Sequence, residues 1–198
     1  MRKFIFILVG MLFTTVANAT DVTLQGAWLH TSSSAYGDSP GVLVRLESPV
    51  FGDFSVGGEF GYHGPQEHSP YGAISGYHVL GEAIYNLHKI LNIEPYILGA
   101  WGWSWWNWDR SGDMEEKGIE INVKDSFAQK YAVGGYYRLS DNWSINVEWN
   151  YFVSHVPKDS FYTSDGSFAN VAGNDDRSGR IRIGQEETSL MVGVRYSF

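Results

Sequence analysis

The sequence contains no cysteine, and no run of about 20 apolar residues follows its first 20 positions. Without cysteine the fold has no disulfide bonds, and a zinc site with thiolate ligands is excluded. A transmembrane helix needs about 20 consecutive apolar residues. Beyond its N-terminus, the chain must therefore cross a membrane as a β-barrel or not cross one at all.

Positive charge is also scarce, with 14 Lys and Arg against 22 Asp and Glu and a net charge of −8. A nucleic-acid-binding protein needs a basic face, so this balance argues against that class. The six histidines lack the spacing typical of metal ligands, and we expect neither a metal nor another cofactor. Proline has no N–H to donate to a strand ladder, so we expect connections or strand edges to contain Pro40, Pro49, Pro65, Pro70, Pro95 and Pro157.

The N-terminus has the layout of a secretory signal peptide. Arg2 and Lys3 precede an uncharged, mostly apolar run from Phe4 to Phe13, and the small-x-small pattern Ala17-Asn18-Ala19 follows. The apolar run is too short for a membrane-spanning helix. We predict a signal peptide over residues 1–19 and one domain over residues 20–198, and the lack of a cysteine at the cleavage site excludes a lipoprotein.

The rest of the chain alternates apolar and polar residues with period two, which predicts β-strands with one apolar and one polar face. In one such segment Val42, Val44 and Leu46 share a face opposite Arg45 and Glu47. The predicted strands cover residues 22–28, 42–47, 54–62, 77–86, 96–105, 130–138, 145–151 and 189–198. The fifth is apolar on both faces, so its register stays open.

The connections between these strands are alternately long and short. The long ones cover about residues 31–40, 64–75, 107–126 and 154–186, and the short ones 48–53, 88–94 and 140–142. Membrane barrels show this rhythm of short periplasmic turns and long outer loops. We therefore predict a closed antiparallel transmembrane β-barrel of about eight strands, in which the strand ending at Phe198 pairs with the one starting near Asp21.

A secreted β-sandwich or lipocalin-like barrel is the soluble alternative. Against it, the polar faces carry four charges of each sign, and charges enclosed in a narrow barrel must be paired. We expect an inward-facing network of Arg45, Glu47, Glu59, Glu82, Lys130, Arg138, Glu148 and Arg195. Arg138→Ala should then leave a buried carboxylate unpaired and lower the stability. His78 lies on the same face as Glu82, and we assign it to this network rather than to an acid–base pair.

The last nine residues, Leu190 to Phe198, resemble the C-terminal strand of bacterial outer-membrane proteins. This resemblance implies that Tyr196 and Phe198 form an assembly signal for the barrel-assembly machinery. Residues 95–100, 124–127, 133–143 and 148–151 are similar to small barrels of the OmpA, OmpX and OmpW type. The resemblance implies a location in the cell outer membrane, with its lipid and lipopolysaccharide as partners.

Catalysis has one local candidate, Ser154-His155, because lipid A deacylases of the PagL kind resemble this region. Those enzymes carry His and then Ser two positions later, which places both on one face of a strand. Here the two residues are adjacent and would point to opposite faces, so the catalytic pattern is broken. We assign no catalytic residue.

Five tryptophans lie between residues 101 and 108. We interpret the first three, Trp101, Trp103 and Trp105, as part of an aromatic girdle at the outer membrane interface. Trp106 and Trp108 are expected in the following loop, as a candidate surface aromatic site that could stack on a glycan or another ligand.

The sequence favours a non-enzymatic outer-membrane barrel with a structural or surface-interaction role. Eight strands make a barrel only wide enough for side chains to fill. The alternative is a narrow conduit for small hydrophobic molecules, as the OmpW-type resemblance implies, and Leu80 and Ile84 on an inward face are consistent with it. A lipid A-modifying enzyme is a third, weaker hypothesis, and a host or extracellular ligand stays unknown.

Overall fold

The computed structural model describes residues 20–31, 38–68, 72–110, 119–121, 126–155, 161–163 and 185–198. The predicted signal peptide, residues 1–19, lies outside this part of the chain. The described residues form ten strands: β1 (Asp21–Thr31), β2 (Ser39–Phe51), β3 (Phe54–His68), β4 (Gly72–Asn86), β5 (Ile93–Arg110), β6 (Ile119–Ile121), β7 (Ser126–Arg138), β8 (Trp143–His155), β9 (Phe161–Thr163) and β10 (Gln185–Ser197). Within the described ranges, no helix is long and apolar enough to span a membrane.

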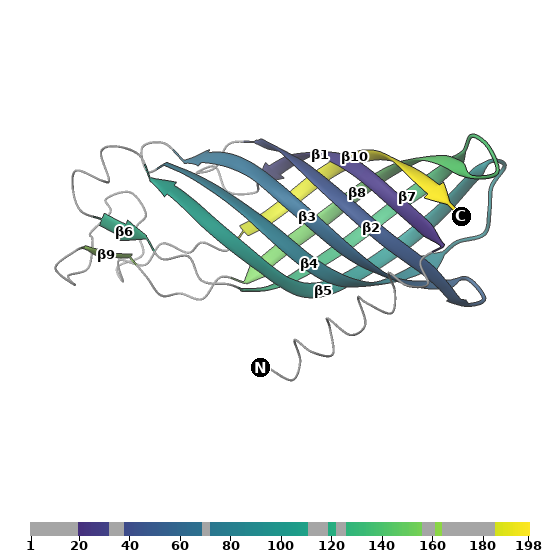
Figure 1. Cartoon of the computed structure of the whole chain (residues 1–198), viewed down its shortest axis with the longest axis horizontal. Coiled ribbons are helices and arrows are strands. Elements are labelled where there is room, and N and C mark those ends of the chain that lie inside the picture. The colour runs from purple at the N-terminus through teal and green to yellow at the C-terminus, as the bar shows by residue number, and fades with distance from the viewer. Residues whose placement is uncertain are drawn as a thin grey trace.

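Eight of these strands form a closed antiparallel barrel in the order β1-β10-β8-β7-β5-β4-β3-β2 (Figure 1). The strand at the C-terminus closes it, because β10 pairs with β1 from Asp21↔Ser197 to Thr31↔Glu187. The predicted fold and the predicted closing pair are both confirmed. The C-terminus lies at the end of the barrel that carries the short turns (Figure 1).

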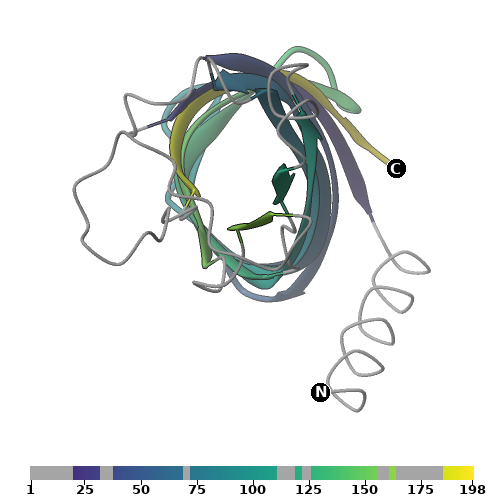
Figure 2. The same ribbon diagram turned by 90° about the vertical axis from the view of Figure 1, so that its left-hand side faces the viewer.

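Two of the connections predicted as long loops each contain one short strand, and these two strands pair with each other. β6 and β9 form a separate two-stranded sheet, with Glu120 opposite Tyr162. This pair lies beyond the barrel strands, at the end with the long connections (Figure 1), and it projects over the barrel opening in the end view (Figure 2). Segments of three residues are too short for alternation to reveal, so the sequence did not predict them.

The barrel strands extend further than the hydrophobic pattern does. β5 continues to Arg110, and its pairing with β4 runs from Asn86↔Tyr96 to Gly72↔Arg110. Pro65 lies inside β3 rather than in a connection, at a register shift between His63 and Gln66. A bulge accommodates a residue that cannot donate to the ladder, which explains why the strand continues past this proline.

Large apolar side chains cover the outside of the barrel at every second position. On β8, Trp143, Ile145, Val147 and Trp149 are exposed, whereas the alternate residues Asn146, Glu148 and Asn150 are buried. The open register of β5 is settled in the same way, since Trp101 and Trp105 face outward. An apolar outer surface with polar residues inside is the arrangement of a barrel surrounded by lipid.

The inward-facing side chains include an apolar group and a polar group. An apolar cluster lies on β4, β5, β7 and β8 and includes Leu80, Ile84, Leu98 and Phe152. Of the 21 described buried polar residues, 12 come from β1, β2, β3 and β10, and the other nine, including Lys130 and Glu148, lie on the same strands as the apolar cluster. The interior charges are therefore close to apolar side chains, where an unpaired charge is costly.

Candidate functional site

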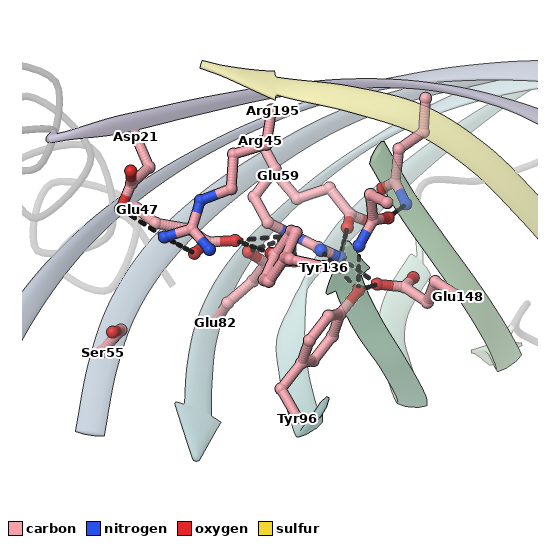
Figure 3. Close-up of polar contacts among 12 residues, drawn as sticks. Asp21, Arg45, Glu47, Ser55, Glu59, Glu82, Tyr96, Tyr136, Glu148 and Arg195 are labelled. Carbon is pink, nitrogen blue, oxygen red and sulfur yellow. Dashed lines mark hydrogen bonds and ion pairs between the residues drawn. The ribbon is translucent and has the colours of Figure 1, made fainter. Parts of the chain in front are cut away.

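Arg45 of β2 lies at the centre of the lumen and is fully buried. Its guanidinium nitrogens lie 2.7 Å from a carboxylate oxygen of Glu148, 3.0 Å from Glu82, 3.2 Å from Glu59 and 3.9 Å from Glu47. Figure 3 shows these acids around the guanidinium. Because they project from β2, β3, β4 and β8, this one side chain connects opposite walls of the barrel.

Lys130 of β7 is the second buried cation of this network. Its Nζ lies 2.5 Å from Glu59 Oε2 and 2.9 Å from Glu148 Oε1, so two carboxylates are shared between Lys130 and Arg45. The Tyr96 hydroxyl donates a 2.6 Å hydrogen bond to Glu148 Oε2 and accepts one of 3.3 Å from Arg45. Hydrogen bonds between ionised partners are the strong class.

Arg195 of β10 extends the network toward the end with the short turns. Its Nη2 lies 2.6 Å from Asp21 Oδ2 and 3.8 Å from Glu47 Oε2, and its guanidinium lies 4.1 Å from the centroid of the Tyr136 ring. The Tyr136 hydroxyl donates to Glu47 Oε1 over 2.5 Å. Glu47 therefore joins this group to Arg45.

Two histidines extend the network in the other direction. His78 Nε2 lies 2.8 Å from Glu59 Oε1, His63 Nε2 lies 2.7 Å from His78 Nδ1, and His63 Nδ1 lies 2.7 Å from Glu187 Oε2. A Cβ atom at Gly61 would overlap the His78 ring, so glycine provides the space for this arrangement.

Three serine hydroxyls form a separate buried cluster. Ser104, Ser126 and Ser154 lie within 2.5–2.9 Å of one another. The indole of Trp106 donates to Ser154 over 2.9 Å and to Ser104 over 3.1 Å. Within the described ranges, the Ser154 hydroxyl forms hydrogen bonds with two hydroxyls and an indole, and with no imidazole or carboxylate.

At the start of β2, Asp38 is exposed and bonds back to β1. Its Oδ1 lies 2.6 Å from His30 Nδ1, and its Oδ2 accepts a 3.3 Å hydrogen bond from Trp28. These hydrogen bonds lower the pKa of the Asp38 carboxyl below its ordinary value. They tie the two ends of the first long connection together.

The structure brings seven of the eight predicted network residues together, and Arg138 is the exception. Arg138 has the inward parity of Tyr136, but it is the last residue of β7, its side chain is 48% exposed, and it pairs with Glu94 at 2.9 Å. The odd or even position of a residue in a strand predicts which face its side chain occupies. It does not predict how far the residue lies from the end of the barrel. The expected membership of Arg138, and the buried partner expected for it, are therefore wrong.

The expected balance of four charges of each sign is also wrong. The described interior holds three cations, Arg45, Lys130 and Arg195, with the carboxylates of Asp21, Glu47, Glu59, Glu82, Glu148 and Glu187. Asp21, His63 and Glu187 were missed because they lie at or beyond the ends of the predicted strands. Continuing the Glu59-Gly61 alternation by one more step would have found His63.

The candidate surface aromatic site is not a loop site. Trp106 and Trp108 both belong to β5, and Trp106 is only 7% exposed, with its indole inside the barrel at the serine cluster. The side chain of Trp108 lies outside the described residues. The prediction failed because the apolar alternation fades near Trp105, whereas the β4–β5 ladder continues.

The predicted assembly signal lies at the end with the short turns. Phe198 is exposed, its ring contacts that of Tyr196 at 4.9 Å between centroids, and its N–H donates to Thr20 O over 2.8 Å. The Tyr196 ring also contacts Trp143. These contacts do not test whether Tyr196 and Phe198 act as an assembly signal, so that role stays a prediction.

No family model and no curated protein matches this sequence. Among solved structures, the chain is similar to Neisserial surface protein A (TM-score 0.63, 14% identity, covering 90% of this chain and 96% of that one). It is also similar to Ail, the attachment invasion locus protein of Yersinia pestis (0.50, 14%, 91% and 99%), and to the outer membrane enzyme PagL (0.50, 16%, 87% and 97%). The chain therefore has the same fold as these small eight-stranded outer-membrane β-barrels.

Proposed function

We propose that this protein is a non-enzymatic outer-membrane barrel with a structural or surface-interaction role, exported by a cleaved signal peptide. Its lumen is closed, and the barrel acts as a rigid support for the long connections at one end. The observation that carries this proposal is the fully buried Arg45 with four carboxylates around it. A barrel of this strand number has room for side chains and little else.

The burial of the charges supports a closed lumen. Arg45, Glu59 and Glu148 have no exposed surface, and Lys130 is 1% exposed. Charges that line an aqueous pore keep contact with water, whereas these have exchanged water for one another. To open a path, several charge-assisted hydrogen bonds between facing walls would have to break together.

The apolar side of the lumen supports the same proposal over a conduit for hydrophobic molecules. Leu80 and Ile84 were the residues that favoured a conduit, and both are fully buried in a cluster with Leu98 and Phe152. Side chains of the protein itself occupy the path that an apolar ligand would need. We therefore favour the closed barrel.

The buried serine cluster supports a role without catalysis, although PagL is an enzyme with a similar fold. A serine nucleophile needs an adjacent general base. The hydroxyl of Ser154 is instead directed to two other serines and an indole, all in the interior. Outer-membrane lipid, lipopolysaccharide and the barrel-assembly machinery remain the proposed partners.

Conductance across a planar bilayer tests this proposal. We expect the purified wild-type barrel to give little steady ion current, because the Arg45 network occupies the cross-section. Arg138→Ala is a matched control, since Arg138 lies at the rim, and it should behave like the wild type. A wide porin in the same bilayer checks the sensitivity. Large, steady channels from the wild type would refute the closed lumen and favour the conduit.

A further inference from the structure

The connection between β4 and β5, at the end of the barrel with the short turns, is a hairpin with an apolar tip (Figure 1). Ile90 and Ile93 pair through two backbone hydrogen bonds of 3.0 Å, and Leu91 and Asn92 form the turn between them. Ile90, Leu91 and Ile93 are 63%, 87% and 45% exposed. Three large apolar residues therefore protrude where the other turns of this end meet water.

Ile90 and Ile93 lie on the same outer surface as the lipid-facing residues of β5 and β7. Ile93 is opposite Tyr137 in the ladder, and Ile97, four residues further along β5, is exposed like both of them. The Cγ2 atom of Ile93 lies 3.3 Å from the place of a Cβ atom at Gly135, so Ile93 packs over the outside of β7. Residues directly opposite each other in an antiparallel pair share a face, so Ile90 points outward too.

A bulge in the first arm of the hairpin keeps a fourth apolar residue on that face. The N–H of Leu87 donates to Pro95 O over 2.8 Å. Pro95 is two residues from Ile93, whereas Leu87 is three residues from Ile90, so the first arm contains one extra residue. Leu87 is exposed and lies four residues after the exposed Ala83 of β4, on the outward side.

The opposite face of the hairpin carries its charges. Lys89 Nζ lies 3.4 Å from Glu94 Oε1, and Arg138 Nη2 lies 2.9 Å from the same oxygen. Glu94 precedes the outward-facing Pro95 and is two residues from the buried Tyr96, on the inward side. The N–H of Arg138 also donates to the backbone oxygen of the turn residue Asn92 over 3.0 Å. The hairpin is therefore amphipathic and fixed to β7.

Leu91 occupies a backbone conformation that is unusual for its side chain. Its φ is +57°, in the left-handed region that glycine adopts readily and a bulky residue rarely does. In the β2–β3 turn a similar φ of +53° belongs to Gly52. A leucine in this conformation carries a steric cost and places a large apolar group at the tip. In water nothing offsets that cost, whereas apolar surroundings do.

We propose that the tip of the β4–β5 hairpin is a lipid anchor. Ile90, Leu91 and Ile93 insert into the leaflet at the short-turn end of the barrel, at the boundary between the headgroups and the acyl chains of its phospholipids. The charged face of the hairpin turns toward the barrel axis and water. This inference goes beyond the proposed function and requires only that lipid surrounds the barrel.

Continuity with the lipid-facing surface identifies lipid as the occupant. From the tip toward the middle of the barrel, the described outward positions of β4, β5 and β7 carry no charge, and Ile97, Val133 and Tyr137 among them are exposed. A protein-binding patch typically has a polar rim, and this one has none on the barrel side. The β7–β8 turn differs, because Ser140, Asp141 and Asn142 make it polar throughout.

Single cysteines labelled with the fluorophore NBD test the anchor, since the chain has no cysteine of its own. The labelled barrel is folded in phosphatidylcholine vesicles with and without phospholipids that carry a nitroxide quencher near the headgroup end of an acyl chain. Labels at Ile90 and Leu91 should lose much of their fluorescence to the nitroxide. Lys89 is the matched control, because it is adjacent to Ile90 but on the charged face, and its label should lose little. A label at Asp141, in the polar turn, should also lose little.

A label at Val133, exposed on the outside of β7, shows whether the barrel itself lies in lipid. If Val133 is quenched, and Ile90 and Leu91 are quenched no more than Lys89 and Asp141, the anchor is wrong although the membrane barrel stands. Blue-shifted emission from Ile90 and Leu91 without quenching by the nitroxide lipid would also overturn it, and would assign the patch to contact with a second copy of the chain.

Discussion

Arg45→Ala is expected to lower the free energy of unfolding of the barrel by about 3–5 kcal/mol, the usual cost of removing one partner from a buried ion pair. The substitution leaves Glu59, Glu82 and Glu148 without their shared cation. Lys130 contacts only two of these three acids and cannot replace it. Urea unfolding in lipid vesicles measures the loss of unfolding free energy. A variant that no longer folds would indicate a loss at least as large.

Arg138→Ala is the matched control, because it removes the same side chain from the rim. Its exposed pair with Glu94 should contribute at most about 1 kcal/mol. Arg45→Lys keeps the charge but loses the planar fork that reaches several carboxylates, so it should fall between the two. If Arg45→Ala and Arg138→Ala had similar effects, the central role of Arg45 would be wrong.

Replacing Phe198 with Asp is expected to remove most of the assembled barrel from the outer membrane. We expect this loss because the barrel-assembly machinery would no longer recognise the C-terminus. Loss of packing would be small, since Phe198 is 79% exposed and its ring contacts that of Tyr196 at the surface. The measurement is the amount of heat-modifiable barrel in outer-membrane fractions.

Leu139→Asp provides the comparison, because Leu139 is another exposed apolar residue, in the short turn between β7 and β8 that also contacts the C-terminal strand through Asn142 and Ser197. It should assemble normally, and purified Phe198→Asp should refold into detergent as well as the wild type does. Normal levels of the Phe198 variant in the membrane would count against an assembly signal. Failure of that variant to refold in detergent would assign the effect to stability instead.

Period-two alternation was sufficient to predict the eight barrel strands and the inward faces of seven of them, because each register is fixed by which face meets lipid. The fifth strand is apolar on both faces, and its register stayed open. Alternation predicted the inward position of Arg45 and Lys130 correctly. It could not give depth, and so Arg138 was placed in the lumen although it lies at the rim. Depth depends on where the ladder ends, which the sequence of one strand does not contain.

The partners of each charge could not be predicted either. Arg45 and Glu59 are opposite each other on neighbouring strands. The shorter contact, from Arg45 to Glu148, crosses the lumen between β2 and β8, and the contact from His63 to Glu187 crosses it between β3 and β10. Such pairs depend on the closed shape of the barrel. Alternation along single strands carries no information about them.

Spin labels on single cysteines test most directly whether lipid surrounds this barrel. The chain has no cysteine, so each label reports one position. Labels at Val133, Val147 and Val192, exposed on β7, β8 and β10, should be accessible to oxygen and protected from a water-soluble nickel chelate in vesicles. Labels at Asp53 and Asp141, exposed in the short turns, should show the reverse. Nickel access at all five positions would contradict a transmembrane barrel and indicate a soluble one.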